Sequence, residues 1–459
     1  MNTPLLTLLF ALSLPTAALA ASSGAAPVRQ GRAALDDQVA WDIVEGLTTE
    51  VGQRLAGTDA EARARTWAVA RLKALGFSNV RIEEYRMPVW VRGAETAEIL
   101  GPYPQKLSVV ALGNSGSTGE SGVAAEVAGF GSLDDLKAAP DSAVRGRIVF
   151  IDHAMKATQD GSGYGFFGPT RFEGPGIAAA KGAAAVVIRS VGTDHHRLPH
   201  TGMTRFPPGT QPIPAGALSI PDAENLRRML DRGQPVTMRL VLTPRLLGEQ
   251  VSGNVVAEVP GSDPDAGIVL IGGHLDSWDL GTGAIDDATG MAITAAAAKR
   301  VMDMPSRPRR TIRVVWWGSE EVGGYGSQAY FDAHSKDKVV LVAESDFGAD
   351  RVWRLQTRLA EANKPLADRL ARALAPLGIV SSEGEAGGGA DVGPWVEAGV
   401  AVVDLNQDGT RYFDLHHTAN DTLDKVDPEQ LRQNVAAWTT MLTVVANDPG
   451  DILPAAADP

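Results

Sequence analysis

Unbroken apolar runs recur along the second half of the chain, and helical stretches separate them. The apolar runs cover residues 268–271, 312–317, 339–343 and 400–405, and the helical stretches cover residues 288–301, 365–374 and 428–445. Strands without polar alternation are typical of a sheet buried on both faces, and strands that alternate with helices are typical of parallel pairing. This half of the chain therefore predicts an α/β domain, with a mostly parallel sheet covered by helices on both faces.

A helical pattern and a strand pattern near the N-terminus predict further elements of that domain. Residues 60–75 read as an amphipathic helix, with Trp67, Ala70, Leu72 and Leu75 near helical spacing and Gly76 as the stop. The alternation over residues 80–85 then predicts a strand. We assign residues 21–100 and 249–459 to one α/β domain built from both ends of the chain.

The pattern changes between these two parts, over residues 101–248. Short β-like runs, such as residues 147–151 and 185–188, are separated by loops rich in glycine and proline, and one short helix is expected at residues 175–181. We expect a smaller, β-rich inserted domain here. Residues 163–168 fit G-x-G-x-x-G, but they neither follow a strand directly nor open a helix, so we interpret them as a flexible loop.

The first twenty residues resemble a targeting segment. Residues 5–14 are apolar but too short to span a bilayer, and Ala18-Leu19-Ala20 is a small-x-small cleavage pattern. No Lys or Arg precedes the apolar run, and the alternative is a buried N-terminal helix. We favour a signal peptide over residues 1–20 and an exported protein, periplasmic or secreted. We expect no membrane span elsewhere.

The amino-acid composition limits the kinds of catalytic and metal site that the chain can form. The 459 residues include no cysteine, which excludes disulfides, iron–sulfur clusters and a thiol nucleophile, so any zinc must be held by histidine and carboxylate. The formal net charge of −13, from 42 basic and 55 acidic residues, argues against a nucleic-acid partner.

Polar side chains of the metal-binding type stand where the predicted strands end. They are His274 and Asp276 after the first strand, Asp286 in the next loop, Glu320 and Glu321 after the second, Asp346 after the third, and His416 and His417 after the fourth. The carboxyl ends of neighbouring parallel strands meet at one sheet edge, where open α/β sheets bind ligands. Several carboxylates gathered there would repel one another unless a cation neutralised them.

Each of these residues also has a simpler interpretation. Asp287 could cap the following helix, a lone loop histidine is more often structural, and Glu320-Glu321 could be a solvated turn. Residues of the types that bind metal ions would rarely follow four separate strands by chance. The pattern therefore favours a metal site.

These motifs resemble the di-zinc exopeptidases, which include secreted aminopeptidases and glutamate carboxypeptidases. The string His274-Leu275-Asp276-Ser277-Trp278-Asp279 and the doubled His416-His417 resemble the plasma glutamate carboxypeptidase branch in particular. The insertion, with its Ala178–Ala183, Ile188–Val191 and His200–Gly202 segments, resembles a protease-associated domain. The resemblance covers nearly all of the chain after residue 20.

The resemblance implies a role for each residue. Asp286 would bridge two zinc ions; His274 and Asp346 would complete one site, and Glu321 and His417 the other. Glu320 would be the general base toward a metal-bridging water, Asp276 would fix the imidazole of His274, and the Asp286–Asp287 peptide would be cis. His416 stands where some relatives have a tyrosine that donates to the oxyanion.

The implied function is a secreted zinc metallopeptidase that cleaves dipeptides or short peptides, and a broad-specificity aminopeptidase is the alternative. A receptor-like binding protein without catalysis is a different class, and the retained metal ligands argue against it. The implied partner is a peptide substrate, and a homodimer is possible. Asp391 could support the site or its own loop. His153, His195, His196 and His200 in the insertion are interpreted as loop residues, of which one or two could face the cleft.

Overall fold

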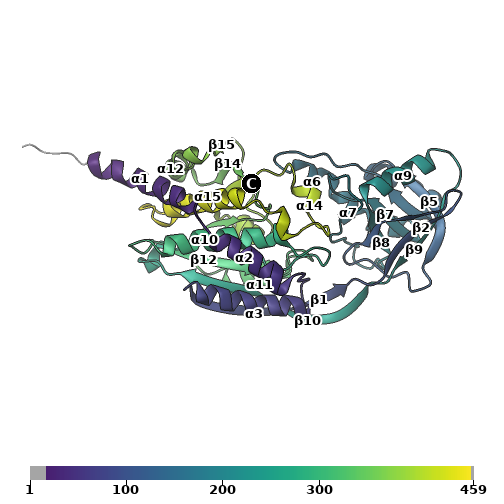
Figure 1. Cartoon of the computed structure of the whole chain (residues 1–459), viewed down its shortest axis with the longest axis horizontal. Helices are drawn as coiled ribbons and strands as arrows, with labels where there is room; N and C mark the ends of the chain where they lie inside the picture. Colours follow the sequence, from purple (N-terminus) through teal and green to yellow (C-terminus); the bar gives the residue numbers. More distant parts are fainter. Residues whose placement is uncertain (1–16, 456–459) are drawn as a thin grey trace, which may run out of the picture.

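The computed structural model describes residues 17–455, which form two units side by side along the long axis of the molecule (Figure 1). The first unit contains an eight-stranded sheet in the order β1-β10-β12-β11-β13-β16-β14-β15. Its strands are β1 (Ser78–Val91), β10 (Arg245–Val259), β11 (Ile268–His274), β12 (Thr311–Trp317), β13 (Val339–Glu344), β14 (Val352–Arg358), β15 (Val380–Ser381) and β16 (Ala401–Gln407).

The centre of this sheet is parallel and its flanks are mixed. Strands β12, β11, β13 and β16 run parallel to one another. On either side of them, the pairs β1–β10, β10–β12 and β14–β16 are antiparallel, and the short β15 pairs in parallel with β14. The expectation of a mostly parallel sheet therefore holds for the four strands predicted from the apolar runs. The antiparallel strands lie outside those runs and carry more exposed positions.

Helices cover both faces of the first sheet, as expected. One face packs against α2 (Val39–Gly46), α3 (Asp59–Ala74), α10 (Thr289–Met302), α12 (Lys364–Leu374) and α15 (Pro428–Ala446), and the other against α11 (Tyr325–His334) and α13 (Gly393–Glu397). Successive residues of β11 divide between the faces: Val269 and Ile271 join the first core and Leu270 the second. Helix α1 (Ala17–Ala34) lies along α15.

Helix α3 forms close to its expected position, but its buried face is different. The buried positions are Glu61, Ala64, Arg65, Ala68 and Leu72, whereas Ala70 is exposed. The helix has too few apolar side chains to fill this face, and the pair between Arg65 Nε and Glu61 Oε1, 3.0 Å apart, completes it. Gly76 ends the segment with a φ of +91°, as its proposed stop role requires.

The second unit, which we call the inserted unit (residues 92–244), has a sheet of its own in the order β3-β2-β9-β5-β6-β7-β8-β4. Its strands are β2 (Glu95–Gly101), β3 (Gln105–Leu107), β4 (Val109–Ala111), β5 (Val123–Phe130), β6 (Ile148–Ile151), β7 (Ala185–Arg189), β8 (Ala215–Leu218) and β9 (Thr237–Leu242). The sheet of this unit thus begins before residue 101 and ends with β9, and the first unit resumes with β10 at Arg245, before residue 248.

The short helix expected at residues 175–181 is confirmed, but this unit contains further helices that were not predicted from the sequence. Helices α4 (Leu133–Ala138) and α8 (Gly174–Ala180) pack on one face of its sheet and α9 (Ile220–Leu230) on the other, with short helices α5 (Asp141–Val144), α6 (Ser162–Phe167) and α7 (Pro169–Phe172) beside them. The signal for α9 was present in the sequence. Ser219 caps the helix, and Ile220, Ala223 and Leu226 recur at helical spacing.

The glycine-rich segment expected to be a flexible loop is helix α6. Gly161 precedes it with a φ of +69°, and the Asp160 carboxylate accepts from the Ser162 amide at 3.1 Å. Tyr164 of this helix stacks on Phe413 of the first unit, with ring centroids 4.9 Å apart. Packing across the two units therefore fixes a segment whose local sequence is flexible.

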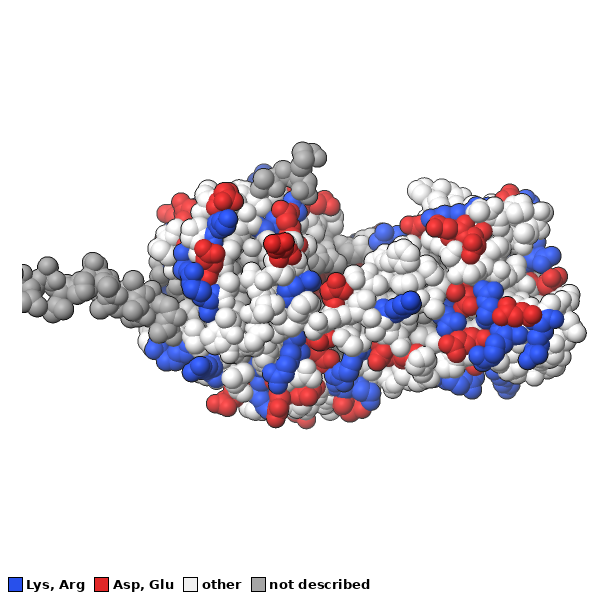
Figure 2. Space-filling view, turned by 90° about the horizontal axis from the view of Figure 1, so that it is seen from above, with Lys and Arg blue, Asp and Glu red and all other residues white. Residues whose placement is uncertain are grey.

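The expected signal peptide lies mostly outside the described residues, and the cleavage position after Ala20 falls within α1. Among the helices of residues 17–455, none has both the length and the apolar character needed to cross a membrane. Acidic and basic side chains are interspersed over the face seen in Figure 2, on both units.

Candidate active site

The predicted metal-type residues meet at the carboxyl ends of the parallel strands. His274 ends β11, Glu320 and Glu321 follow β12, and Asp346 follows β13. Asp286 lies in the turn before α10, and His416 and His417 follow the short helix α14 (Tyr412–Leu415). All of them except the fully buried His274 border a cavity of about 760 Å³, within the range of about 300–1,000 Å³ typical of small-molecule sites.

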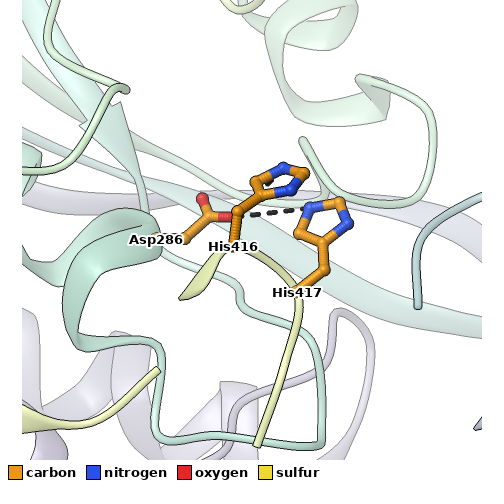
Figure 3. A group of neighbouring side chains, drawn as sticks. All are labelled: Asp286, His416 and His417. Carbon is orange, nitrogen blue, oxygen red and sulfur yellow. Dashed lines mark ion pairs between the residues drawn. The ribbon is translucent and has the colours of Figure 1, made fainter. Parts of the chain in front are cut away.

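Asp286 stands between the two groups of side chains. Its Oδ1 lies 3.1 Å from His274 Nε2, and its Oδ2 lies 3.3 Å from His417 Nε2. Figure 3 shows the rings of His416 and His417 beside this carboxylate. The peptide bond between Asp286 and Asp287 is cis, as expected from the resemblance. One carboxylate therefore presents one oxygen to each histidine, which is the arrangement that a bridging ligand needs.

Each histidine has a second carboxylate close to the same nitrogen. Asp346 Oδ1 lies 3.4 Å from His274 Nε2, and Glu321 Oε2 lies 2.9 Å from His417 Nε2. The structure thus brings together both expected sets: His274, Asp286 and Asp346, and His417, Asp286 and Glu321.

Several oxygens in these sets are buried and have no hydrogen-bond partner among the described residues. They are Asp286 Oδ2, Glu321 Oε1 and Asp346 Oδ1. Buried carboxylate oxygens are normally satisfied. Imidazole nitrogen with carboxylate oxygen is also a donor set that Zn²⁺ accepts, so these side chains fit zinc ions.

Both histidines are held in the tautomer that leaves Nε2 free. His274 Nδ1 donates to the backbone carbonyl of Asp276 at 3.0 Å, and His417 Nδ1 donates to the backbone carbonyl of Thr201 at 3.2 Å. A carbonyl can only accept, so each ring keeps a proton on Nδ1, and Nε2 is the nitrogen that faces Asp286 and offers its lone pair to a metal ion once its own proton is lost.

Asp276 acts differently from the expectation. Its carboxylate Oδ1 is 3.7 Å from His274 Nδ1, too far for a hydrogen bond, and accepts instead from the Glu320 amide at 3.1 Å. Asp276 therefore orients His274 through its main chain and uses its side chain to hold the turn that carries Glu320. Burial, opposed by His274, raises the pKa of Asp276 to about 6.

Glu320 and Glu321 are adjacent but differ in environment. Glu321 is buried against His417, whereas Glu320 is half-buried and borders the cavity. Burial raises the pKa of Glu320 well above its usual range; His274 opposes this shift, and Asp346 and Glu321 add to it. A carboxyl group of raised pKa beside a metal-type site is suited to accept and return a proton.

The geometry distinguishes the two members of the doubled histidine pair. Their rings stack 3.5 Å apart, and His416 Nε2 lies 3.7 Å from Asp286 Oδ2. Only His417 also contacts Glu321 and has its Nδ1 bonded. These contacts favour His417 as the ligand. Burial and the neighbouring His417 lower the pKa of His416 well below its usual value, so His416 is a neutral ring facing the cavity.

Sequence reasoning left three supporting residues unassigned. Asp421 accepts from the amides of Ile285 (2.6 Å) and Asp286 (3.2 Å), and its position four residues after the doubled His416-His417 could have suggested this role. Arg54 donates to the carbonyls of the same loop from Leu275 to Gly283, and its segment carries no motif. Asp391 is buried at the cavity wall and has no hydrogen-bond partner for its carboxylate among the described residues.

Known proteins share both this sequence and this architecture. Residues 254–442 match the model of peptidase family M28. Carboxypeptidase Q of Mus musculus is 35% identical over 412 residues, which are 89% of this chain and 85% of that protein. Carboxypeptidase Q of Homo sapiens has the same identity and coverage. The resemblance to the plasma glutamate carboxypeptidase branch, another name for carboxypeptidase Q, is therefore confirmed.

Solved structures agree with this relationship. The crystal structure of a peptidase M28 precursor from Shewanella amazonensis is 44% identical, covers 95% of this chain and 100% of its own, and superimposes with a TM-score of 0.93. An aminopeptidase from an Aneurinibacillus species has the same fold at a TM-score of 0.63, with 22% identity, 94% of this chain covered and 98% of its own. The chain therefore belongs to peptidase family M28.

Proposed function

We propose that the protein is an exported di-zinc exopeptidase that hydrolyses dipeptides or other short peptides in the manner of carboxypeptidase Q. The observation that carries this proposal is the position of Asp286, whose two oxygens face two separate histidine–carboxylate pairs. His274 and Asp346 would hold one zinc ion, and His417 and Glu321 the other, with Asp286 shared.

Different side chains around this site would take different catalytic roles. Two zinc ions, when bound, acidify a water molecule and polarise the scissile carbonyl. Glu320 accepts the proton of that water and delivers it to the leaving amine. We assign to His416, whose neutral ring stacks beside His417, the donation of a hydrogen bond to the carbonyl oxygen as negative charge develops there.

The inserted unit supports the restriction to short substrates. Tyr164, Arg171 and Met203 of this unit border the same cavity as Glu320 and Asp346 of the first unit. A cavity walled by both units has room for a short peptide and leaves little for a long chain. We propose that the insertion, assigned to residues 101–248 from the sequence, is a protease-associated domain with this role.

The experiment that tests the proposal is product identification from a panel of dipeptides, N-blocked dipeptides and C-amidated dipeptides, with and without a chelator. We expect free dipeptides to be cleaved and cleavage to stop when the chelator removes zinc. Cleavage of C-amidated and longer peptides at equal rates would favour the broad-specificity aminopeptidase instead. Absence of hydrolysis with zinc supplied would contradict the enzyme proposal.

Glu320→Gln tests the proposed proton transfer separately from metal binding. The amide cannot accept the water proton, so we expect kcat to fall by at least about 10²-fold while zinc content stays unchanged. Elemental analysis and steady-state kinetics measure the two quantities. Glu361→Gln, on an exposed side chain, is the matched control and should leave both unchanged. More than a tenth of wild-type turnover in Glu320→Gln would contradict the role.

Export stays a prediction from residues 5–20 and is checked by sequencing the N-terminus of the mature protein, which should begin at Ala21. The homodimer likewise stays a prediction, measurable by sedimentation.

A further inference from the structure

We infer that the inserted unit holds one of the two zinc-binding histidines in position, through residues 193–201 with His200 as their anchor. This inference rests on the proposed di-zinc function. It assigns the insertion a part in building the metal site, in addition to limiting substrate length.

The hydrogen bonds that orient the rings of His274 and His417 come from different parts of the chain. His274 donates to a carbonyl only two residues further along the same loop. His417 donates to the carbonyl of Thr201, which lies 216 positions away in the inserted unit. Partners that fix the tautomer and direction of a metal-binding imidazole strongly affect metal affinity. One half of the site is therefore supported locally and the other half across the two units.

The contact to Thr201 belongs to a continuous seam between the units. The Thr201 amide donates to the His417 carbonyl at 3.0 Å, and the Thr193 amide donates to the Phe413 carbonyl at 3.1 Å. The Thr193 hydroxyl also donates to Asp414 Oδ1 at 2.7 Å. Figure 1 places the preceding helix, α14, at the junction beside α6 and α7. The whole turn before the ligand is thus bonded to the insertion.

His200 anchors this seam. Its Nδ1 donates to the His416 carbonyl at 2.6 Å, and its Nε2 bonds to the Asp194 carboxylate. The ring is buried, and Gly192 makes room for it, because a Cβ there would lie 2.2 Å from His200 Nε2. The neighbouring His195, in contrast, is exposed.

Further bonds fix the Thr201 side chain. Its hydroxyl donates to the Ala111 carbonyl at 2.8 Å and accepts from Arg92 at 3.1 Å. Arg92 is paired in turn with Asp279, the last residue of the string that begins at His274. The carbonyl that receives His417 is therefore held by contacts from both units.

The backbone of His417 needs such support. Its φ of +62° is a left-handed conformation that a residue with a side chain seldom adopts and that persists only where the surroundings hold it. Thr201 bonds both the main chain and the ring of His417. Without the seam, this turn would relax and Nε2 would leave its position beside Asp286 and Glu321.

The test compares zinc binding by the full-length wild type, His200→Ala, His200→Asn and His195→Ala, titrated against a competing chromophoric chelator. We expect wild type and His195→Ala to bind two zinc ions per chain. In His200→Ala the affinity of one site should fall roughly 10- to 100-fold, with the other unchanged. His200→Asn should recover most of the loss, because its amide nitrogen can replace Nδ1 as the donor to His416.

A second comparison separates positioning from general damage to the fold. In a His417→Ala background, where the supported site is already lost, His200→Ala should not change the affinity for the remaining zinc ion. If His200→Ala does not fold, Thr201→Val should show a smaller loss at the same site, because it removes only the hydroxyl contacts. Two zinc ions bound with wild-type affinity by His200→Ala, or by folded Thr201→Val in its place, would overturn the inference and leave the proposed function standing. A wild type that binds no zinc would overturn both.

Discussion

The metal-type residues were predictable from the sequence because each lies directly after a recognisable strand or within a short motif. His274 ends β11, Glu321 and Asp346 follow β12 and β13, and the sheet alone brings them together. The residues that sequence reasoning missed act over long distances. Arg54 and Thr201 reach the site only through tertiary packing. The segment of Arg54 carries no motif, and the His200–Gly202 segment does not reveal that Thr201 contacts His417.

Protons compete with metal at His417. Burial on its own lowers the pKa of this ring, but Glu321 and Asp286 outweigh burial and raise the pKa to about 9. Below that pH the metal-free ring is protonated, and zinc must displace the proton to reach Nε2. Zinc affinity should therefore weaken as the pH falls below about 9, by up to about tenfold per pH unit for each proton displaced.

Calorimetric zinc titrations of the metal-free protein in buffers of different ionisation enthalpy measure the number of protons released. At pH 7 we expect zinc binding to release protons from the wild type, and to release one proton fewer from His417→Ala. Equal proton release from the two proteins would contradict the assignment.

At the scale of elements, strands were predicted better than helix faces. The four apolar runs correspond to β11, β12, β13 and β16. They were recognisable because a strand buried on both faces carries apolar side chains at nearly every position. Helix α3 was placed correctly, yet its buried face includes the Glu61–Arg65 pair, which no hydrophobic pattern reveals. Helix α6 was missed because its packing partner, Phe413, is distant in the sequence.

Leu72→Ala tests which face of α3 is buried. Leu72 has no exposed surface, so removing its side chain should lower the free energy of unfolding by about 2–5 kcal/mol. Lys73→Ala, on the exposed side of the same helix, should change it by less than about 0.5 kcal/mol. Urea denaturation curves compare the variants, and similar effects from both would show that the face is assigned wrongly.

At the scale of the whole molecule, the cavity lies between two units that each have their own sheet. The carboxylates of the site repel one another when no cation is present. A ligand that binds only the folded state stabilises it in proportion to the logarithm of its concentration over Kd. Removing zinc should therefore lower Tm by several degrees.

Thermal unfolding with and without a chelator checks this expectation. Added zinc should restore Tm, and added magnesium should not, because Mg²⁺ favours all-oxygen ligand sets. An unchanged Tm after verified zinc removal would contradict the coupling between metal and fold.

The pairing of β1 with β10 has a consequence for the order in which the protein is made. Ser78 pairs with Glu258, so β1 leaves the ribosome long before its partner exists. Every strand of the inserted unit lies between Glu95 and Leu242. The sheet of this unit can therefore form while β1 is still unpaired. Once closed, it brings the two ends of the insertion together and shortens the loop that β1 and β10 must close. We therefore expect the insertion to fold first and the sheet around it to be completed afterwards during synthesis.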